Sequence, residues 1–272
     1  MTIRVWGQPA AQAHGAIDAA FARITHVHDR MSFQCPGSDV SRLNRAGIGE
    51  RLRIDPETVA VLRQAQAVAR AARGVFDPTV AGDLVREGLL PAPAGARPPD
   101  PRATFDDVVL AEDGVVSLSR ALWLDLSGIA KGHAVDRAIA ALAEAGVTEA
   151  CVNAGGDLRA IGRACPVALR TGFPDEALAV VTLEDGSLAS SGGRAESRHA
   201  AAGQHRNGVL RMPTVPGRFA CVLAQTCAVA DALTKVVLAL GLGAGDVLAG
   251  FGATAHLREP DGSWHALGCA AG

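Results

Sequence analysis

The stretch that most constrains the fold is Leu124-Asp-Leu-Ser-Gly-Ile-Ala-Lys-Gly-His-Ala-Val-Asp136. It predicts an apolar strand over 121–126, a tight turn at Ser127-Gly128 and then an amphipathic helix. Such a junction leaves backbone N–H groups free at the start of the helix, where an anion is favoured. Asp125 and Lys131 lie at this junction, and an acid with an ammonium suits a phosphate and its metal. A surface ion pair beside a helix cap is the alternative.

Three further carboxylates lie at predicted element junctions. Pro78 forces Asp77 out of the α region and into a turn. Asp157 follows two glycines that let the backbone approach a ligand closely. Asp231 lies in the predicted first turn of a helix, where we expect a partly exposed side chain. Metal-held phosphates need hard oxygen ligands, so together with Asp125 the set favours a polyphosphate-metal site over four independent caps.

The composition narrows the class of protein. With 272 residues, 49% hydrophobic and 20% charged, the chain can bury a sizeable core, which excludes disorder. We expect one domain over 1–272. The net charge is -2 and the basic residues are scattered, so no electrostatic footprint for nucleic acid is present. Aromatic residues are 4%, without tyrosine, which leaves few platforms for base stacking.

The cysteines and the N-terminal residues indicate the compartment. Six cysteines are spread singly without a C-x-x-C pair, which predicts free thiols in a reducing compartment rather than a zinc site or a disulfide framework. The first residues carry neither a signal sequence nor a lipid-attachment cysteine. No apolar run approaches the ~20 residues of a membrane span. We therefore expect a soluble cytoplasmic protein without membrane insertion. A periplasmic lipoprotein is the alternative, expected only if a leader has been removed from the sequence.

The remaining pattern predicts a mixed α/β fold with antiparallel hairpins rather than a βαβ series. Helices are expected over 10–31 and 56–73, the second with Asp55 as N-cap and Pro56 at its first position. The Pro-rich segment 91–101 is an extended surface connection, and 192–217 forms a long loop or lid. Short strands are predicted at 105–110, 115–119, 121–126, 149–153, 157–161, 167–171, 178–183, 219–224 and 253–257.

Common motifs of nucleotide and acyl-transfer enzymes are absent. The chain has no G-x-x-x-x-G-K-[ST], and Gly155-Gly156 is not part of a G-x-G-x-x-G. Ser127 and Lys131 are four residues apart, one too many for S-x-x-K, and no G-x-S-x-G occurs. A phosphate site in this chain must therefore be built in another way.

Six stretches of the chain, in the same order as in the family, resemble the FAD:protein FMN transferase (ApbE) family. They are Met31–Asn44 (MSFQCPGSDVSRLN), Gly74–Val80 (GVFDPTV), Asp125–Asp136 (DLSGIAKGHAVD), Val152–Asp157 (VNAGGD), Leu188–Gly192 (LASSG) and Ala230–Leu233 (ADAL). The resemblance implies an ApbE-like fold with mixed, largely antiparallel sheets and packed helices. It also implies an enzyme that binds FAD with Mg²⁺. A threonine of a partner flavoprotein then attacks the FMN-side phosphorus, and AMP leaves.

The resemblance also implies roles for single residues. The residues implied to contact FAD are Val75, Phe76, Asp77, Asp125 and Lys131. Those implied to line the nucleotide pocket are Asn153, Gly155, Gly156 and Asp157. The implied metal ligands are the backbone of Gly128 and Asp231, with Thr234 beside them, and the implied catalytic residues are Asp231 and Lys131.

The chain departs from the family pattern at three places. It begins after the usual Met-Gly-Thr strand. The His-x-Ile-Asp-Pro segment is missing, with His205-Arg-Asn-Gly-Val209 as its nearest counterpart. Lys235 stands where a hydroxyl ligand is common, and its ammonium would repel Mg²⁺, partly substitute for its charge, or point into solvent. These departures leave open a non-enzymatic or altered-chemistry FAD-binding protein, and after it a structural role with an empty pocket.

Overall fold

We analysed a computed structural model, which describes residues 1–171, 179–192 and 205–268. Its main sheet has the strand order β1-β5-β6-β9-β12-β13-β14, and every neighbouring pair is antiparallel. The expected mixed α/β fold with largely antiparallel sheets is therefore confirmed. The strands are β1 (Thr2–Trp6), β5 (Glu149–Asn153), β6 (Asp157–Ile161), β9 (Ser187–Gly192), β12 (Phe219–Ala224), β13 (Thr254–Arg258) and β14 (Trp264–Leu267).

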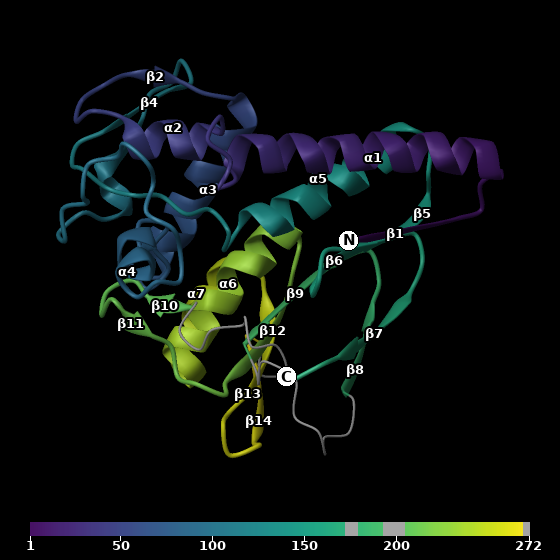
Figure 1. The fold of residues 1–272 in the computed structure, drawn as a ribbon. Helices are drawn as coiled ribbons and strands as arrows, with labels where there is room; N and C mark the ends of the chain where they lie inside the picture. The colour runs from purple at the N-terminus through teal and green to yellow at the C-terminus, as the bar shows by residue number, and fades with distance from the viewer. Residues whose placement is uncertain (172–178, 193–204, 269–272) are drawn as a thin grey trace.

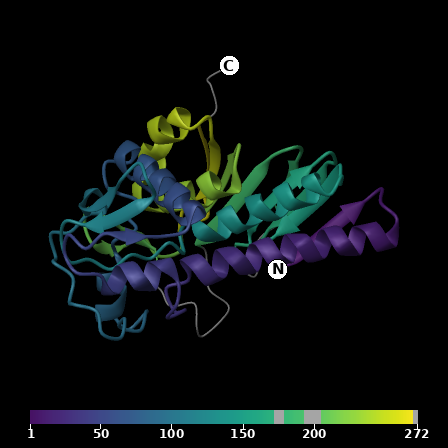
Figure 2. The same cartoon turned by 90° about the horizontal axis from the view of Figure 1, so that it is seen from above.

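Two helices cover one face of this sheet, and a third packs outside them (Figures 1 and 2). They are α5 (Ala130–Glu144), α6 (Cys227–Leu240) and, packed along α5, the long α1 (Ala10–Met31). The predicted helix 10–31 is thus confirmed. Alternating strand residues such as Ala220 and Val222 face α6, while Phe219 and Cys221 face the opposite side, as the two-residue period of a strand requires.

The opposite face of the sheet is covered in part by a hairpin of β7 (Cys165–Leu169) and β8 (Ala179–Leu183). A separate group of elements gathers at the C-terminal end of α1 (Figure 1). It contains α2 (Asp39–Arg45), α3 (Pro56–Ala71), α4 (Ala81–Arg86), the short helix η1 (Phe105–Asp107), and a small sheet of β2 (Leu52–Arg53), β4 (Val115–Leu118) and β3 (Val108–Leu110). The chain closes with η2 (Gly241–Ala244) and α7 (Gly245–Gly250) before β13.

Segment 121–126 is not a strand, contrary to the sequence prediction. It belongs to no sheet. Instead the buried amide of Asn44 bonds to both backbone groups of Leu124: the N–H of Leu124 donates to Oδ1 at 2.7 Å, and Nδ2 donates to the carbonyl at 3.0 Å. The segment is apolar because it crosses the core. Its backbone groups at Leu124 bond to the side chain of Asn44 instead of to a neighbouring strand.

The expected loop over 192–217 contains two strands of two residues each in its described part. Gly192 ends β9, and a hairpin of β10 (Arg206–Asn207) and β11 (Met212–Pro213) follows; residues 193–204 lie outside the described residues. The hairpin docks on the turn after Gly74, since Gly208 donates to the carbonyl of Val75 at 2.8 Å. The Pro-rich segment 91–101 contains no helix or strand, as predicted.

Two further sequence expectations concern cysteines and membranes. Among the described residues Cys35, Cys151, Cys165, Cys221 and Cys227 are all free thiols, and Cys269 lies outside them. Contrary to the hydropathy expectation, Cys227–Gly250 is long and apolar enough for a membrane span by length and composition alone. Because 67% of its most apolar window is buried inside the protein, this segment has the environment of a core helix.

Candidate functional site

The site is built where the first turns of α5 and α6 cross. Gly132 lies at this crossing, and a Cβ at that position would overlap the carbonyl oxygen of Cys227. The carboxylate of Asp136, on the next turn of α5, accepts the N–H groups of Cys227 at 3.0 Å and Ala228 at 2.9 Å. It thereby caps the amino end of α6, whose own N-cap is Thr226. The two helices are thus fixed to one another at the site.

Asp231 is fully buried, not partly exposed as the sequence predicted. The error has a local cause: α6 begins at Cys227 rather than at Ala230, so Asp231 lies beneath the α5 crossing. Its Oδ2 accepts the N–H of Gly132 at 3.2 Å, and its Oδ1 forms an ion pair with Lys235. Both carboxylate oxygens of Asp231 are therefore engaged.

Lys235 points into the site rather than into solvent, and its side chain is 12% exposed. Its Nζ donates to Oδ1 of Asp231, to the carbonyl oxygen of Asp231 at 3.1 Å and to Oγ of Ser191 at 3.2 Å. Thr234, predicted to lie beside the metal, is fully buried and its hydroxyl donates to the same carbonyl at 2.7 Å. Ser191 belongs to β9, so the main sheet supplies part of the site.

Lys131 is the second ammonium of the site. Its Nζ lies 2.6 Å from Oδ2 of Asp157, and half of its side chain is exposed. Burial alone would lower the pKa of Lys131, but Asp231 and Asp157 outweigh it and raise the pKa. Burial also raises the pKa of Asp157, with Asp231 acting in the same direction. Oδ1 of Asp157 is a buried oxygen without a hydrogen-bond partner in the described residues.

Two turns bring the remaining predicted carboxylates to the same place. The N–H of Asp125 donates to the carbonyl of Pro78 at 2.8 Å, which joins the turn after Gly74 to the start of α5. Asp125 accepts the N–H and hydroxyl of Ser127 at 2.9 and 2.7 Å. Asp77 lies 3.3 Å from Arg211 of the β10–β11 hairpin. Burial raises the pKa of both carboxyls against these hydrogen bonds.

A cavity of about 520 Å³ gathers these groups. Its lining includes the predicted residues Phe76, Asp77, Asp125, Gly128, Lys131 and Gly155, together with Lys235. Asn153 and Gly156 line an adjoining cavity, in which Oδ1 of Asn153 accepts the N–H groups of both glycines of the turn. Val75, Asp157, Asp231 and Thr234 lie buried behind the surface, where they position other groups.

Sequence reasoning missed two residues of the cavity. His205 lines it, and its segment was predicted only as the nearest counterpart of His-x-Ile-Asp-Pro, with no role for the imidazole. Burial lowers the pKa of His205 to about 3, and the charges of Lys235 and Lys131 act in the same direction, so the imidazole is neutral. Ser191 lies within the stretch Leu188–Gly192, which gave no indication of its contact with Lys235.

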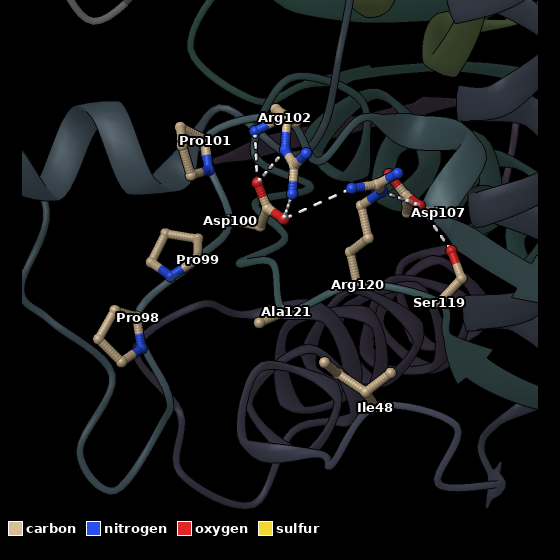
Figure 3. Close-up of a pocket in the computed structure, with 10 residues that line it drawn as sticks. All are labelled: Ile48, Pro98, Pro99, Asp100, Pro101, Arg102, Asp107, Ser119, Arg120 and Ala121. Atoms are coloured by element: carbon tan, nitrogen blue, oxygen red, sulfur yellow. Dashed lines mark hydrogen bonds and ion pairs between the residues drawn. The ribbon is translucent and has the colours of Figure 1, made fainter.

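Another depression lies beside the Pro-rich segment, with a volume of about 780 Å³ (Figure 3). Its charged side chains bond to one another: Arg102 and Arg120 reach Asp100, and Arg120 also lies 3.2 Å from Asp107. We place the functional site instead at the cavity with the lysines, because the residues that the sequence singled out line that cavity and not this depression.

The metal site implied by the resemblance does not fit the observed donors. Both oxygens of Asp231 are engaged, one of them by the ammonium of Lys235, and the hydroxyl of Thr234 donates to a carbonyl. A divalent cation needs such oxygens free of another cation. The site as arranged therefore holds an ammonium where the metal was expected.

Comparison with known proteins gives a family and two curated relatives. The model of the ApbE family matches residues 1–255. A Rhodobacter capsulatus protein named FAD:protein FMN transferase is 30% identical over 216 residues, which are 72% of this chain and 40% of that protein. A Treponema pallidum protein of the same name is 26% identical over 175 residues, 59% of this chain and 48% of that protein. The chain thus spans less than half the length of these curated relatives.

Solved structures show the same fold. The ApbE protein of Thermotoga maritima has a TM-score of 0.81 at 22% identity, covering 97% of this chain and 92% of that one. The family model covers nearly the whole chain, including every residue that lines the cavity. The chain therefore belongs to the ApbE family.

Proposed function

We propose that this protein is an FAD:protein FMN transferase, which moves FMN from FAD to a threonine of a partner flavoprotein and releases AMP. The observation that carries the proposal is the convergence of Lys131 and Lys235 on one cavity at the start of α5. Two ammonium groups beside a helix N-terminus provide the positive field that a pyrophosphate requires. The names of the relatives support the choice of flavin as the transferred group.

The shape of the site supports a dinucleotide substrate. The central cavity shares Asp125, Ser127 and Lys131 with a more apolar hollow of about 330 Å³ between α1 and α5. On another side it shares Gly155 and Ser190 with a hollow of about 770 Å³. A molecule with two ring systems joined by a pyrophosphate matches a charged centre flanked by two hollows, and these volumes are typical of ligand sites.

The residues of the cavity suit phosphoryl transfer. The acceptor hydroxyl attacks the FMN-side phosphorus, so that its oxygen gains the P–O bond while the bond to the AMP phosphate breaks. His205 lines the cavity as a neutral imidazole. We assign it to accept the hydroxyl proton once the phosphates of bound FAD offset the charges of Lys131 and Lys235, which lower its pKa in the free protein. Lys131 and Lys235 stabilise the charge on the transferring phosphoryl group. The Mg²⁺ requirement implied by the resemblance is not part of this proposal, because the donors observed at Asp231 and Thr234 do not fit a metal.

The test is an FMN-transfer assay with a flavoprotein domain that carries an acceptor threonine. The protein, the domain and FAD are incubated, and covalent flavin is measured by fluorescence of the denatured acceptor while chromatography measures AMP. We expect equal amounts of both products, and neither with a Thr→Ala acceptor. AMP without covalent flavin would indicate a hydrolase instead.

A flavin-binding protein without transfer activity is the second candidate. The ion pair between Lys235 and Asp231 favours it, because it ties up the carboxylate that the family resemblance assigns to catalysis. Tight FAD binding with neither AMP nor covalent flavin, tested with several acceptor domains, would support this second function.

A further inference from the structure

Lysine is used in this chain only at the site. Lys131 and Lys235 are its two lysines, whereas the other residues among its 26 Lys and Arg are all arginines. Arginine and lysine differ in shape: guanidinium is a flat fork, whereas ammonium is a compact point charge with three donors. Both lysines line the same cavity and each pairs with a buried carboxylate, Asp157 or Asp231.

The surroundings of Lys235 select a compact cation. Its three donors meet three oxygens: Oδ1 of Asp231, the carbonyl of Asp231 and Oγ of Ser191. Its stem lies close to the turn before α5, since a Cβ on Gly128 would lie 3.5 Å from Cε. A carboxylate, a carbonyl and a hydroxyl are also the donor types that bind divalent metals. Here these oxygens surround an ammonium.

We propose that Lys235 is the built-in cation of this site and that the protein binds its pyrophosphate ligand without a divalent metal. The identity of the ligand rests on the proposed function, but the exclusion of the metal does not. The bond from Lys235 to Ser191 is the one a phosphate oxygen can replace, because Ser191 lines the cavity whereas Asp231 is buried behind it. Lys131 supplies the second positive charge from its half-exposed side chain.

Metal binding alone provides the first test. Mn²⁺, which reports on Mg²⁺ sites, is titrated into the protein without flavin, and free Mn²⁺ is measured by electron paramagnetic resonance. We expect Lys235→Thr to bind Mn²⁺ at least about tenfold more tightly than the parent, because a like charge in contact with the metal position is removed. The double variant Lys235→Thr/Asp231→Asn is the matched control and should lose this gain. Equal Mn²⁺ affinity of parent and Lys235→Thr overturns the proposal.

Ligand binding by the unaltered protein provides the second test, which needs no variant. The affinities for ADP and FAD are measured by calorimetry in EDTA and again in Mg²⁺. We expect each pair of values to agree within about twofold, against a dependence of tenfold or more for a site that needs the metal. Affinity that appears only with Mg²⁺ overturns the proposal even if FMN transfer is observed. Metal-independent binding of ADP upholds it even if no FMN transfer is found.

Magnetic resonance of the two lysines connects the tests to the structure. A protein labelled with ¹³C and ¹⁵N in lysine should give two side-chain signals, assigned with Lys131→Arg. ADP in EDTA should shift the Cε and Nζ signals of both lysines. A signal of Lys235 that does not respond to saturating ADP would show that its ammonium does not face the phosphates, and the proposal would fail.

Discussion

The backbone N–H of Gly132 donates to Oδ2 of Asp231, at a point where α5 leaves no room for a side chain. A single glycine thus allows two helices to approach and also fixes the carboxylate that holds Lys235. The position of the Lys235 ammonium therefore depends on the backbone contact between α5 and α6, and not on side-chain packing alone.

Replacing Gly132 by alanine should force the two helices apart. The added methyl group would overlap the carbonyl of Cys227, and overpacking of a core contact destabilises proteins by about 1–3 kcal/mol. Gly15→Ala in α1 is the matched control, since a Cβ there meets nothing within 4 Å; it should be neutral or slightly stabilising. Denaturant unfolding compares the two. Equal free energies of unfolding would show that α6 shifts without strain.

Removing the carboxylate of Asp136 should loosen the start of α6. Its two oxygens accept the N–H groups of Cys227 and Ala228, and Oδ1 also lies 2.6 Å from Arg159. We expect Asp136→Ala to lower the free energy of unfolding by about 1–3 kcal/mol, the range for losing a cap and stranding buried donors. The exposed Asp18 serves as control by Asp18→Ala. A protein as stable as this control would mean that water replaces the cap.

Asn44 should contribute more to the stability of the fold than a polar side chain of its size usually does. Asn44→Ala leaves both backbone groups of Leu124 without their partner in a buried segment, at a cost of about 1–3 kcal/mol for each stranded group. Hydrogen exchange should locate the effect, with faster exchange at Leu124 than in α1. Gln34→Ala, at an exposed position, should change neither measurement; an unchanged Leu124 in Asn44→Ala would refute the role given to the amide.

His205 should make the protein less stable in acid. Its pKa in the folded state is about 3, against an ordinary value of 6.5. As the pH falls from about 6.5 towards 3, His205 becomes protonated in the unfolded chain but stays neutral in the folded protein. The free energy of unfolding should then fall by up to about 1.4 kcal/mol per pH unit. Relative to His205→Gln, the parent should lose stability between pH 6 and 4. Parallel stability curves would contradict the buried, neutral imidazole.

Ligand binding should raise the pKa of His205. The two lysines that help to lower it will be neutralised by a bound diphosphate, so binding near pH 5 should be accompanied by proton uptake at this residue. Calorimetry of ADP binding in two buffers of different ionisation enthalpy measures the protons exchanged, and His205→Gln gives the contribution of ADP itself. Identical proton counts in the two proteins would place His205 away from the phosphates.

The sequence correctly predicted turns and helix ends that depend only on neighbouring residues along the chain. The Asp113-Gly114 turn connects β3 and β4, as an Asp-Gly pair with positive φ at glycine should. The helix after Ser127 ends where Gly146 adopts a φ of +80°. Asp125 and Lys131 reach one cavity because only one short turn separates Asp125 from the start of α5.

The remaining features depend on neighbours that no local pattern contains. Segment 187–192 consists mainly of Ser, Ala and Gly, yet it is the strand β9 because β6 and β12 pair with it on both sides. The pattern 121–126 is strand-like, but no strand lies beside it. The burial of Asp231 and the direction of Lys235 follow from the α5 crossing, which sequence periodicity does not predict.

The confinement of lysine to one cavity has a consequence for how the protein can be modified. Acetylation of a lysine removes its charge, and on most proteins that event falls on the exterior, far from any ligand. In this chain each lysine side chain lines the site. Any acetyl group placed on a lysine of this chain would therefore remove one of the two ammonium charges of the cavity, and half of the Lys131 side chain is exposed to such a reaction.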